Sequence, residues 1–182
     1  MTFFAHYRAK MRGGGTCPPC ASTVEIFWSW LGSFLGILLV AGLEQLFFTG
    51  TDLFLMIGSF GASAVLLYAA PTSPLAQPRN LLGGHLVSAF IGVVFFQMVP
   101  QQAWLASSLA VSLSIVGMHL TRTLHPPGGA TALIAVIGSK QVHDLGFLYL
   151  LIPVFVGACL LLVVALFVNN LAPGRRYPLW WF

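Results

Sequence analysis

Six apolar windows limit what this chain can fold into more than any other feature of its sequence. A helix needs about 20 predominantly apolar residues to cross the hydrocarbon core of a bilayer. Of the 182 residues, 58% are hydrophobic and only 7% are charged, which leaves no room for a soluble catalytic domain. We therefore expect an all-α integral membrane bundle. The windows cover residues 26–48, 52–70, 82–99, 103–120, 128–139 and 147–168.

The window at residues 128–139 is too short to span a membrane as a helix. About a dozen residues form a helix of about 18 Å, whereas the hydrocarbon core is about 30 Å thick. The distribution of basic residues indicates that this segment nevertheless completes a crossing, because six crossings leave only Lys140 on the outer side. The basic residues on the cytoplasmic side are then Arg8, Lys10, Arg12, Arg79, Arg122, Arg175 and Arg176.

This count defines the expected organisation of the chain. Residues 1–25 and 172–182 are predicted cytoplasmic tails, and residues 26–171 are predicted to form the transmembrane domain. The expected location is a bacterial inner membrane with both termini in the cytoplasm. A bundle of six crossings that includes one half-helix is also expected to gain support from self-association as a homo-oligomer.

A run of helix-breaking residues precedes the short window. His125, Pro126 and Pro127 are followed by Gly128 and Gly129. Proline lacks an N–H group and pushes the residue before it out of the helical region. Irregular backbone at membrane depth is tolerated only where it is buried in protein or lines a wet cavity. The run therefore predicts an internal cavity next to a half-helix.

A sequence similar to the start of the short window occurs earlier in the chain. The sequence Gly-Ala-Ser-Ala-Val at residues 61–65 resembles Gly-Ala-Thr-Ala-Leu at residues 129–133, a shift of 68 positions. If this is a repeat, each unit has three crossings, so the two units are inverted in the membrane. The alternative is chance similarity between two helices rich in small residues.

An inverted repeat predicts an anion site between two helix N-termini. Helix N-termini present unpaired N–H groups and the positive end of the helix dipole, and glycine lets a ligand approach the backbone. Hydroxyl groups at Ser63 and Thr131 add donors at equivalent positions. The candidate substrate-binding residues are Ser59, Gly61, Ser63, Arg122, His125, Gly128, Gly129 and Thr131.

Several ionisable residues are candidates for handling charge. His125 is predicted to bind the anion when protonated or to carry a proton beside it, and the alternative is a neutral ring that caps loop carbonyls. Arg122 suits bidentate contact with a planar oxyanion or acts only as an inside-positive anchor. His85 and Glu44 are further candidates for proton linkage. The alternative for His85 is a hydrogen bond to a neighbouring helix. The alternative for Glu44 is an ion pair with Lys140.

These stretches resemble a known family. Residues 58–80, the Gly-Gly-His at residues 83–85 and residues 120–133 are similar to signature stretches of the HPP family of integral membrane proteins, named for the His-Pro-Pro motif. Members from plastids and cyanobacteria are associated with nitrite transport, so the resemblance implies a transporter of nitrite or a related anion. The family is commonly described with four spans, whereas the windows and charges here predict six.

The leading expectation is thus a transporter for a small monovalent anion. The alternatives are an anion channel that uses the same site and a non-transporting scaffold or sensor, in which the glycines serve only close helix packing. No catalytic carboxylate pair, Ser/His/Asp spacing or metal quartet points to an enzyme, and no cofactor, metal or nucleic-acid partner is expected. Cys17 and Cys20 have Cys-x-x-Cys spacing, but a lone pair is weak evidence for a metal or redox site.

Overall fold

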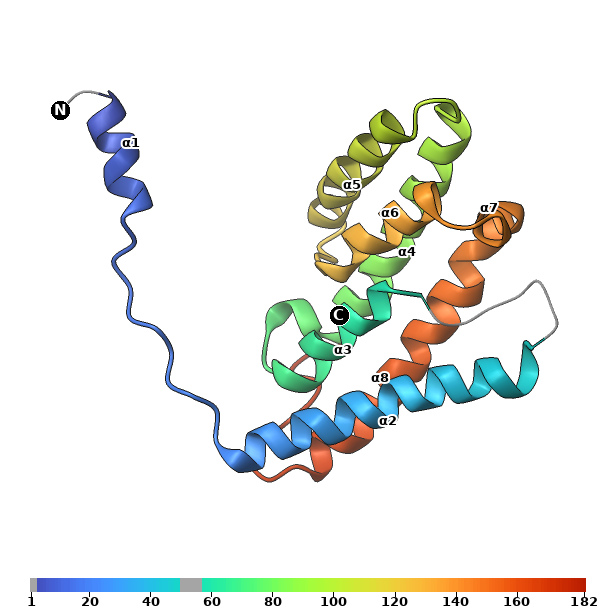
Figure 1. Cartoon of the computed structure of the whole chain (residues 1–182). Coiled ribbons are helices and arrows are strands. Elements are labelled where there is room, and N and C mark those ends of the chain that lie inside the picture. The colour runs from blue at the N-terminus through green and yellow to red at the C-terminus, as the bar shows by residue number, and fades with distance from the viewer. Residues whose placement is uncertain (1–2, 50–56) are drawn as a thin grey trace.

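Every regular element in the described part of the chain is a helix. The structure is a computed structural model that describes residues 3–49 and 57–182. Helix α1 (Phe3–Met11) stands apart, buries no residue and is joined to the bundle by an extended segment (Figure 1). The bundle contains α2 (Thr23–Phe47), α3 (Ser59–Ala69), η1 (Pro74–Ala76), α4 (Pro78–Met98), α5 (Ala103–Leu120), α6 (Pro127–Ile137), α7 (Lys140–Leu145), η2 (Gly146–Leu150), η3 (Leu151–Phe155) and α8 (Val156–Leu171).

Four helical segments in the described residues are long and apolar enough to cross a membrane. They are Thr23–Phe47, Pro78–Met98, Ala103–Leu120 and the run Lys140–Leu171, which has a kink at Ile152. The predicted half-helix after the His-Pro-Pro motif is confirmed, since α6 has 11 residues. The expectation of a full span at residues 52–70 is wrong for the described part of that window, because α3 also has only 11 residues. Pro71 follows α3 closely and lacks the N–H group that would continue the helix.

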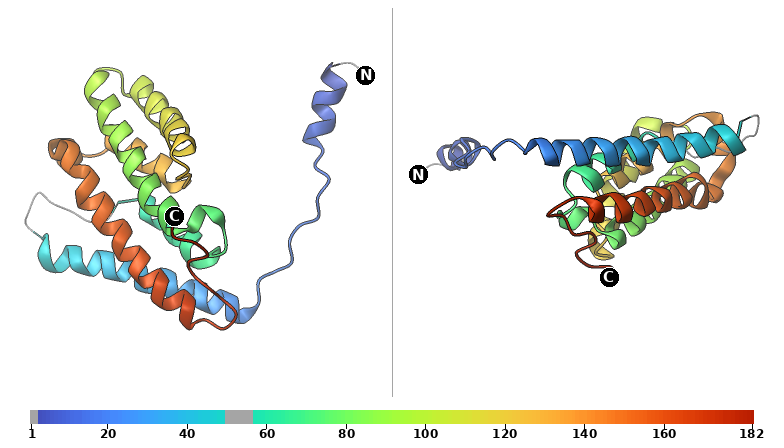
Figure 2. Two further views of the ribbon diagram at one scale, coloured as in Figure 1. Left: turned by 180° about the vertical axis from the view of Figure 1, so that it is seen from behind. Right: turned by 90° about the horizontal axis from the view of Figure 1, so that it is seen from below.

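The helices pack in two groups that meet at α4. Helices α4, α5 and α6 lie against one another, and α2 packs on α3 and α8 (Figures 1 and 2). The larger apolar core contains Phe60 and Leu67 of α3 and Leu161 of α8. Polar contacts also hold α3 on α8, because the Tyr68 hydroxyl donates to the Leu161 carbonyl at 2.9 Å. The short helix α3 is thus anchored by packing, although its length makes it a weak helix on its own.

The start of α2 and the end of α8 lie at the same end of the bundle. Arg175, just after α8, forms an ion pair with Glu25 in the first turn of α2, with 2.5 Å between Nη2 and Oε1. The same guanidinium donates to Ser29 Oγ, to Asn169 Oδ1 and to the Tyr68 carbonyl. We call Arg175 and these partners the tail clamp. Both ends of the membrane domain therefore lie together.

The C-terminal residues continue from the tail clamp onto the turn before α4, as Figure 2 shows. The Tyr177 hydroxyl donates to the Ala76 carbonyl at 2.8 Å, and the Leu179 amide donates to Gln77 Oε1 at 2.8 Å. Burial raises the pKa of Tyr177, so its hydroxyl keeps the proton that this bond requires. Arg79 follows this turn and donates to the Thr121 carbonyl, which brings a further basic residue to the same end.

Candidate functional site

Five polar side chains with no solvent exposure meet at the crossing of the two short helices. We call them the polar cluster. Three elements and one loop contribute to it, and the members are Ser59 and Ser63 of α3, His85 of α4, His125 of the loop before α6, and Thr131 of α6. Buried polar groups are costly at membrane depth unless they are hydrogen-bonded, so this concentration in an apolar bundle marks the candidate site.

Hydrogen bonds join the polar cluster into one continuous chain. His125 Nδ1 lies 2.8 Å from the Leu75 carbonyl oxygen, and His125 Nε2 lies 2.9 Å from Ser63 Oγ. Ser63 Oγ is also 2.8 Å from His85 Nε2, and His85 Nδ1 is 2.7 Å from Thr131 Oγ1. Thr131 Oγ1 donates to Ser59 Oγ at 2.8 Å. Each imidazole therefore uses both of its nitrogens.

The direction of the two short helices produces this arrangement. Ser63 lies opposite His125, whereas Ser59 lies opposite Thr131 further along α6, so α3 and α6 run antiparallel beside each other. Residues 59 and 63 are four positions apart and therefore share one face of α3. The two N-terminal halves overlap side by side. They do not point at each other across a cavity, as the inverted repeat had suggested.

Gly84 explains how His125 comes so close to α4. A Cβ atom at Gly84 would lie 2.5 Å from His125 Cβ and 2.7 Å from the Thr123 carbonyl oxygen. Real Cβ atoms do not approach other atoms this closely, so only glycine lets the loop lie directly on α4. The Gly-Gly-His sequence thus has a mechanical role, because the glycine next to His85 admits the second histidine.

The backbone amides at the start of α6 are already engaged, which corrects the expectation of bare donors. Gly128 N–H donates to the His125 carbonyl at 2.8 Å, and Gly129 N–H donates to the Pro126 carbonyl at 3.0 Å. Pro127 has no N–H group. At the start of α3, Phe60 N–H donates to the Ile57 carbonyl at 3.0 Å. Side chains, not free amides, therefore dominate the site in this conformation.

The structure separates the remaining candidate residues from the polar cluster. Gly61 is exposed on the outer surface of α3, and a Cβ there would meet no atom within 4 Å. Arg122 is exposed in the loop after α5, with a φ of 57°. Glu44 lies near the end of α2, and Lys140 forms an exposed ion pair with Asp144. Gly128 is buried against α4, where a Cβ would lie 2.7 Å from Ser88 Oγ.

Two neighbours of the polar cluster were not found from the sequence. The Tyr149 hydroxyl of η2 donates to the Thr131 carbonyl at 3.2 Å. Ser88 follows His85 by three positions on α4 and is fully buried, and its Oγ has no hydrogen-bond partner. The spacing of Ser88 places it on the same helix face as His85, so it could have been suspected. Nothing in the local sequence of Tyr149 indicates its contact.

The polar cluster contains no ion pair. In residues 3–49 and 57–182, the two ion pairs join Lys140 to Asp144 and Arg175 to Glu25. The same residues contain no group of three His, Cys, Asp or Glu side chains placed to hold a metal ion. Cys17 and Cys20 are exposed in the extended segment before α2. Hydroxyls and imidazoles alone thus define the chemistry of the polar cluster, and they can donate hydrogen bonds to an oxyanion or exchange protons.

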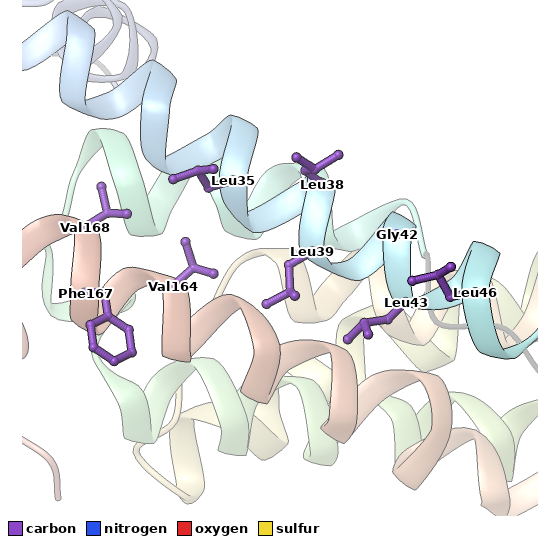
Figure 3. A pocket seen from close by; sticks show the side chains of 9 residues that line it. All are labelled: Leu35, Leu38, Leu39, Gly42, Leu43, Leu46, Val164, Phe167 and Val168. Carbon is purple, nitrogen blue, oxygen red and sulfur yellow. The ribbon is translucent and has the colours of Figure 1, made fainter.

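A groove lies between α2 and α8, shown in Figure 3. Its lining consists of apolar side chains and Gly42. A groove without polar groups offers an anion no compensation for its lost hydration. This surface therefore suits contact with lipid and does not suit an anion. The side chains that line it are Leu35, Leu38, Leu39, Leu43, Leu46, Val164, Phe167 and Val168.

The apolar spans and the buried polar cluster define a multi-pass helical membrane protein. The family model for the transmembrane region of HPP proteins matches residues 18–178, so the chain belongs to the HPP family. Two proteins from Dictyostelium discoideum, each described as a transmembrane protein, are 48% identical to this chain over 99% of its length. The chain spans 58% and 65% of these relatives. No solved structure matches it. Relatives from this organism lend no support to the expected bacterial membrane.

Proposed function

We propose that the chain is a transporter that moves nitrite or another small monovalent anion across the membrane through the polar cluster. The observation that carries the proposal is the convergence of Ser59, Ser63, His85, His125 and Thr131, all fully buried, at the crossing of two short helices. Ionisable groups inside membranes are rare and often mark transport paths, and two of these five side chains are histidines. The resemblance to nitrite-transporting HPP members supplies the substrate class.

The chemistry of the polar cluster suits a small oxyanion. Ser63, Thr131 and the imidazoles of His85 and His125 offer O–H and N–H donors, which bind anionic oxygens more strongly than neutral ones. The two ion pairs of the described residues lie away from the polar cluster, so the carboxylates of Asp144 and Glu25 do not repel an anion there. The polar cluster is closed in this conformation, and we infer that α3 and α6 separate from α4 to admit the anion from each side in turn.

The proposed topology has six crossings in two inverted units. A long, a short and a long helix occur in the order α2, α3, α4 and again in the order α5, α6, α8. In this arrangement each short helix completes a crossing together with the chain that precedes it. The end that holds Arg79 and Arg175 faces the cytoplasm, because cytoplasmic loops carry an excess of basic residues. Self-association into a homo-oligomer remains part of the proposal.

A non-transporting scaffold is the second candidate, and one observation favours it. Gly92 of α4 lies so close to α6 that a Cβ would be 2.7 Å from the Ala132 carbonyl oxygen and 2.7 Å from Ala135 Cβ. Together with Gly128, this contact shows small residues serving close helix packing, as they do in many membrane bundles. A scaffold needs this close packing but does not need the polar cluster. Variants of the polar cluster therefore distinguish a transporter from a scaffold.

The test is anion uptake by proteoliposomes that contain the full chain. Nitrite, nitrate, formate and chloride are compared, and uptake into protein-free liposomes is subtracted. Thr131→Val removes the hydroxyl that joins His85 to Ser59 and keeps the side-chain volume. We expect it to reduce nitrite uptake by at least roughly fivefold, since each of the two lost hydrogen bonds is worth about 1 kcal/mol.

Thr49→Val is the matched control, because Thr49 is exposed just after α2 and its hydroxyl donates to the Gln45 carbonyl, away from the polar cluster. Equal uptake by the Thr131→Val and Thr49→Val proteins, both folded, would remove the polar cluster from the path. Absence of uptake for every anion favours the scaffold. Flux far above the turnover of alternating access identifies a channel through the same site.

A further inference from the structure

The hydrogen atoms in the polar cluster can be counted from its geometry. The Leu75 carbonyl only accepts, so His125 must carry a proton on Nδ1. When Thr131 donates its single hydroxyl hydrogen to Ser59, or to the Pro127 carbonyl at 3.4 Å, His85 Nδ1 donates to Thr131. Each imidazole therefore already carries the one N–H that a neutral ring possesses.

Ser63 then lies between two Nε2 atoms with only one hydrogen to offer. Its Oγ is 2.8 Å from Nε2 of His85 and 2.9 Å from Nε2 of His125, and both distances are those of hydrogen bonds. The hydroxyl can donate to one nitrogen, and it must accept from the other. With Thr131 donating to Ser59, one imidazole needs a second N–H, which makes it an imidazolium. In this arrangement the bonds hold one proton more than two neutral rings supply.

The neutral form of the polar cluster requires one change. Thr131 must turn its hydroxyl from Ser59 to Nδ1 of His85, which frees His85 to donate from Nε2 to Ser63. Ser63 then donates to His125, and every bond points toward the Leu75 carbonyl. The two protonation states thus differ by a single proton and by the direction of the Thr131 hydroxyl.

We propose that His85 and His125 take up one shared proton across Ser63 when a monovalent anion enters the polar cluster, so that anion and proton cross the membrane together in a one-to-one ratio. The inference rests on the proposed function, and it names the coupling ion of the same site. Anion binding and proton binding favour each other to the same degree, because a coupling free energy between two sites is reciprocal.

The surroundings explain why the proton and the anion depend on each other. A buried charge without a partner is strongly disfavoured, and this holds for an imidazolium and for an anion alike. Phe60 of α3 meets the His85 ring edge-on, the His125 ring lies 5.0 Å away, and the hydroxyl of Tyr149 points at the Thr131 carbonyl. The charged Arg79 is engaged at the bundle end. The anion therefore supplies the missing counter-charge.

Proton transfer within the polar cluster needs no other reactant. When His85 is the imidazolium, its Nε2–H bond breaks and the proton passes to Ser63 Oγ, while the hydroxyl hydrogen of Ser63 passes to His125 Nε2. His85 becomes neutral and His125 becomes the imidazolium, so one positive charge moves from α4 to the loop before α6. The proton leaves from His125 when its bond to the Leu75 carbonyl opens. Only N–H and O–H bonds are exchanged.

The test measures nitrite uptake, luminal pH and voltage dependence in the same proteoliposomes. A trapped pH-sensitive dye reports protons, and potassium with valinomycin sets the membrane potential. We expect one proton to enter with each nitrite and the rate to be unaffected by voltage. Because the proton is a co-substrate, uptake must rise as the external pH falls. Protein-free liposomes correct for the diffusion of nitrous acid.

Ser63→Ala and Ser88→Ala form the matched pair of variants. Both remove one buried hydroxyl, but only Ser63 bonds to the imidazoles, whereas Ser88 Oγ has no partner. We expect Ser63→Ala to lower proton-coupled nitrite uptake at least tenfold and to make the residual uptake voltage-dependent. Ser88→Ala should retain the rate and the one-to-one ratio. Equal behaviour of the two variants overturns the proposal.

The remaining outcomes separate this inference from the proposed function. Nitrite uptake without protons, or uptake that follows the voltage, leaves the transporter in place and overturns the shared proton. If no anion is taken up, the proposed function fails, and nitrogen NMR of histidine-labelled protein decides the proton question with nitrite as the probe. Imidazolium signals that appear with nitrite, and vanish in His85→Gln and His125→Gln, support the shared proton. Spectra that stay neutral overturn it.

Discussion

The polar cluster and the tail clamp are two buried polar networks that treat charge in opposite ways. The tail clamp holds a guanidinium whose side chain is 4% exposed, and its partner Glu25 supplies a full negative charge. The polar cluster is buried completely and contains only hydroxyls and imidazoles. The tail clamp thus holds a permanent charge together with its partner, whereas the polar cluster is held by hydrogen bonds between hydroxyls and imidazoles.

The difference follows from where the two networks lie. The tail clamp is at the end of the bundle, where Glu25 keeps 37% of its side chain exposed, so the ion pair is only partly desolvated. The polar cluster lies inside the bundle, where a permanent charge would cost far more. Side chains that change charge only with a ligand are suited to that position, and histidine is the residue whose charge changes near neutral pH.

The largest expected effect comes from removing the charge of the tail clamp. Arg175→Ala breaks the contacts to Glu25, Ser29, Asn169 and the Tyr68 carbonyl together. We expect the free energy of unfolding to fall by about 3 kcal/mol, at the lower end of the range for buried ion pairs because Glu25 is partly exposed. Thermal unfolding in detergent measures it. Arg176→Ala, which removes an exposed charge, should change stability by less than about 0.5 kcal/mol.

A smaller effect is expected where the polar cluster is held by close packing. Gly84→Ala places a Cβ against His125 and the Thr123 carbonyl, so the loop must move away from α4. We expect a loss of about 1–3 kcal/mol from overpacking, and a larger relative loss of nitrite uptake because His125 shifts. Gly61→Ala, on the open surface of α3, should stabilise the protein by about 0.5–1 kcal/mol. Similar unfolding temperatures for these two variants would contradict the packing at Gly84.

The smallest expected effect comes from removing a buried hydroxyl that has no hydrogen-bond partner, and it is compared with the removal of one that has two. Ser88→Ala removes a hydroxyl that has no partner, and we expect a change below about 1 kcal/mol in the stabilising direction. Ser63→Ala leaves two imidazole nitrogens without their partner, and we expect a loss of about 1–3 kcal/mol. Chemical denaturation of both variants provides the measurement. A destabilised Ser88→Ala protein would mean that Ser88 has an unrecognised partner.

Local chemistry in the sequence predicted the break before α6 but not its consequences. Two prolines and two glycines after His125 dictate a non-helical entry and a short helix, whatever the rest of the chain does. The same reasoning left the amides of Gly128 and Gly129 free, whereas the turn at His125 satisfies them. A tight turn that satisfies its own amides depends on backbone angles, which residue types constrain only loosely.

The partners of His85 and His125 were beyond the reach of sequence reasoning. Both residues were candidates because ionisable groups in apolar surroundings are unusual, and the structure brings them to one serine. Ser63 is 22 positions from His85 and 62 from His125, so no local periodicity connects them. Only the antiparallel packing of α3 on α6, which depends on the whole bundle, aligns the three side chains.

The turn before α4 joins the outer edge of the bundle to its interior. Three consecutive residues face different ways, since the Leu75 carbonyl holds His125 while Ala76 and Gln77 hold Tyr177 and Leu179. The C-terminal segment and His125 are therefore held by adjacent residues of the same turn, so the positions of the tail and of one imidazole depend on the same three peptides.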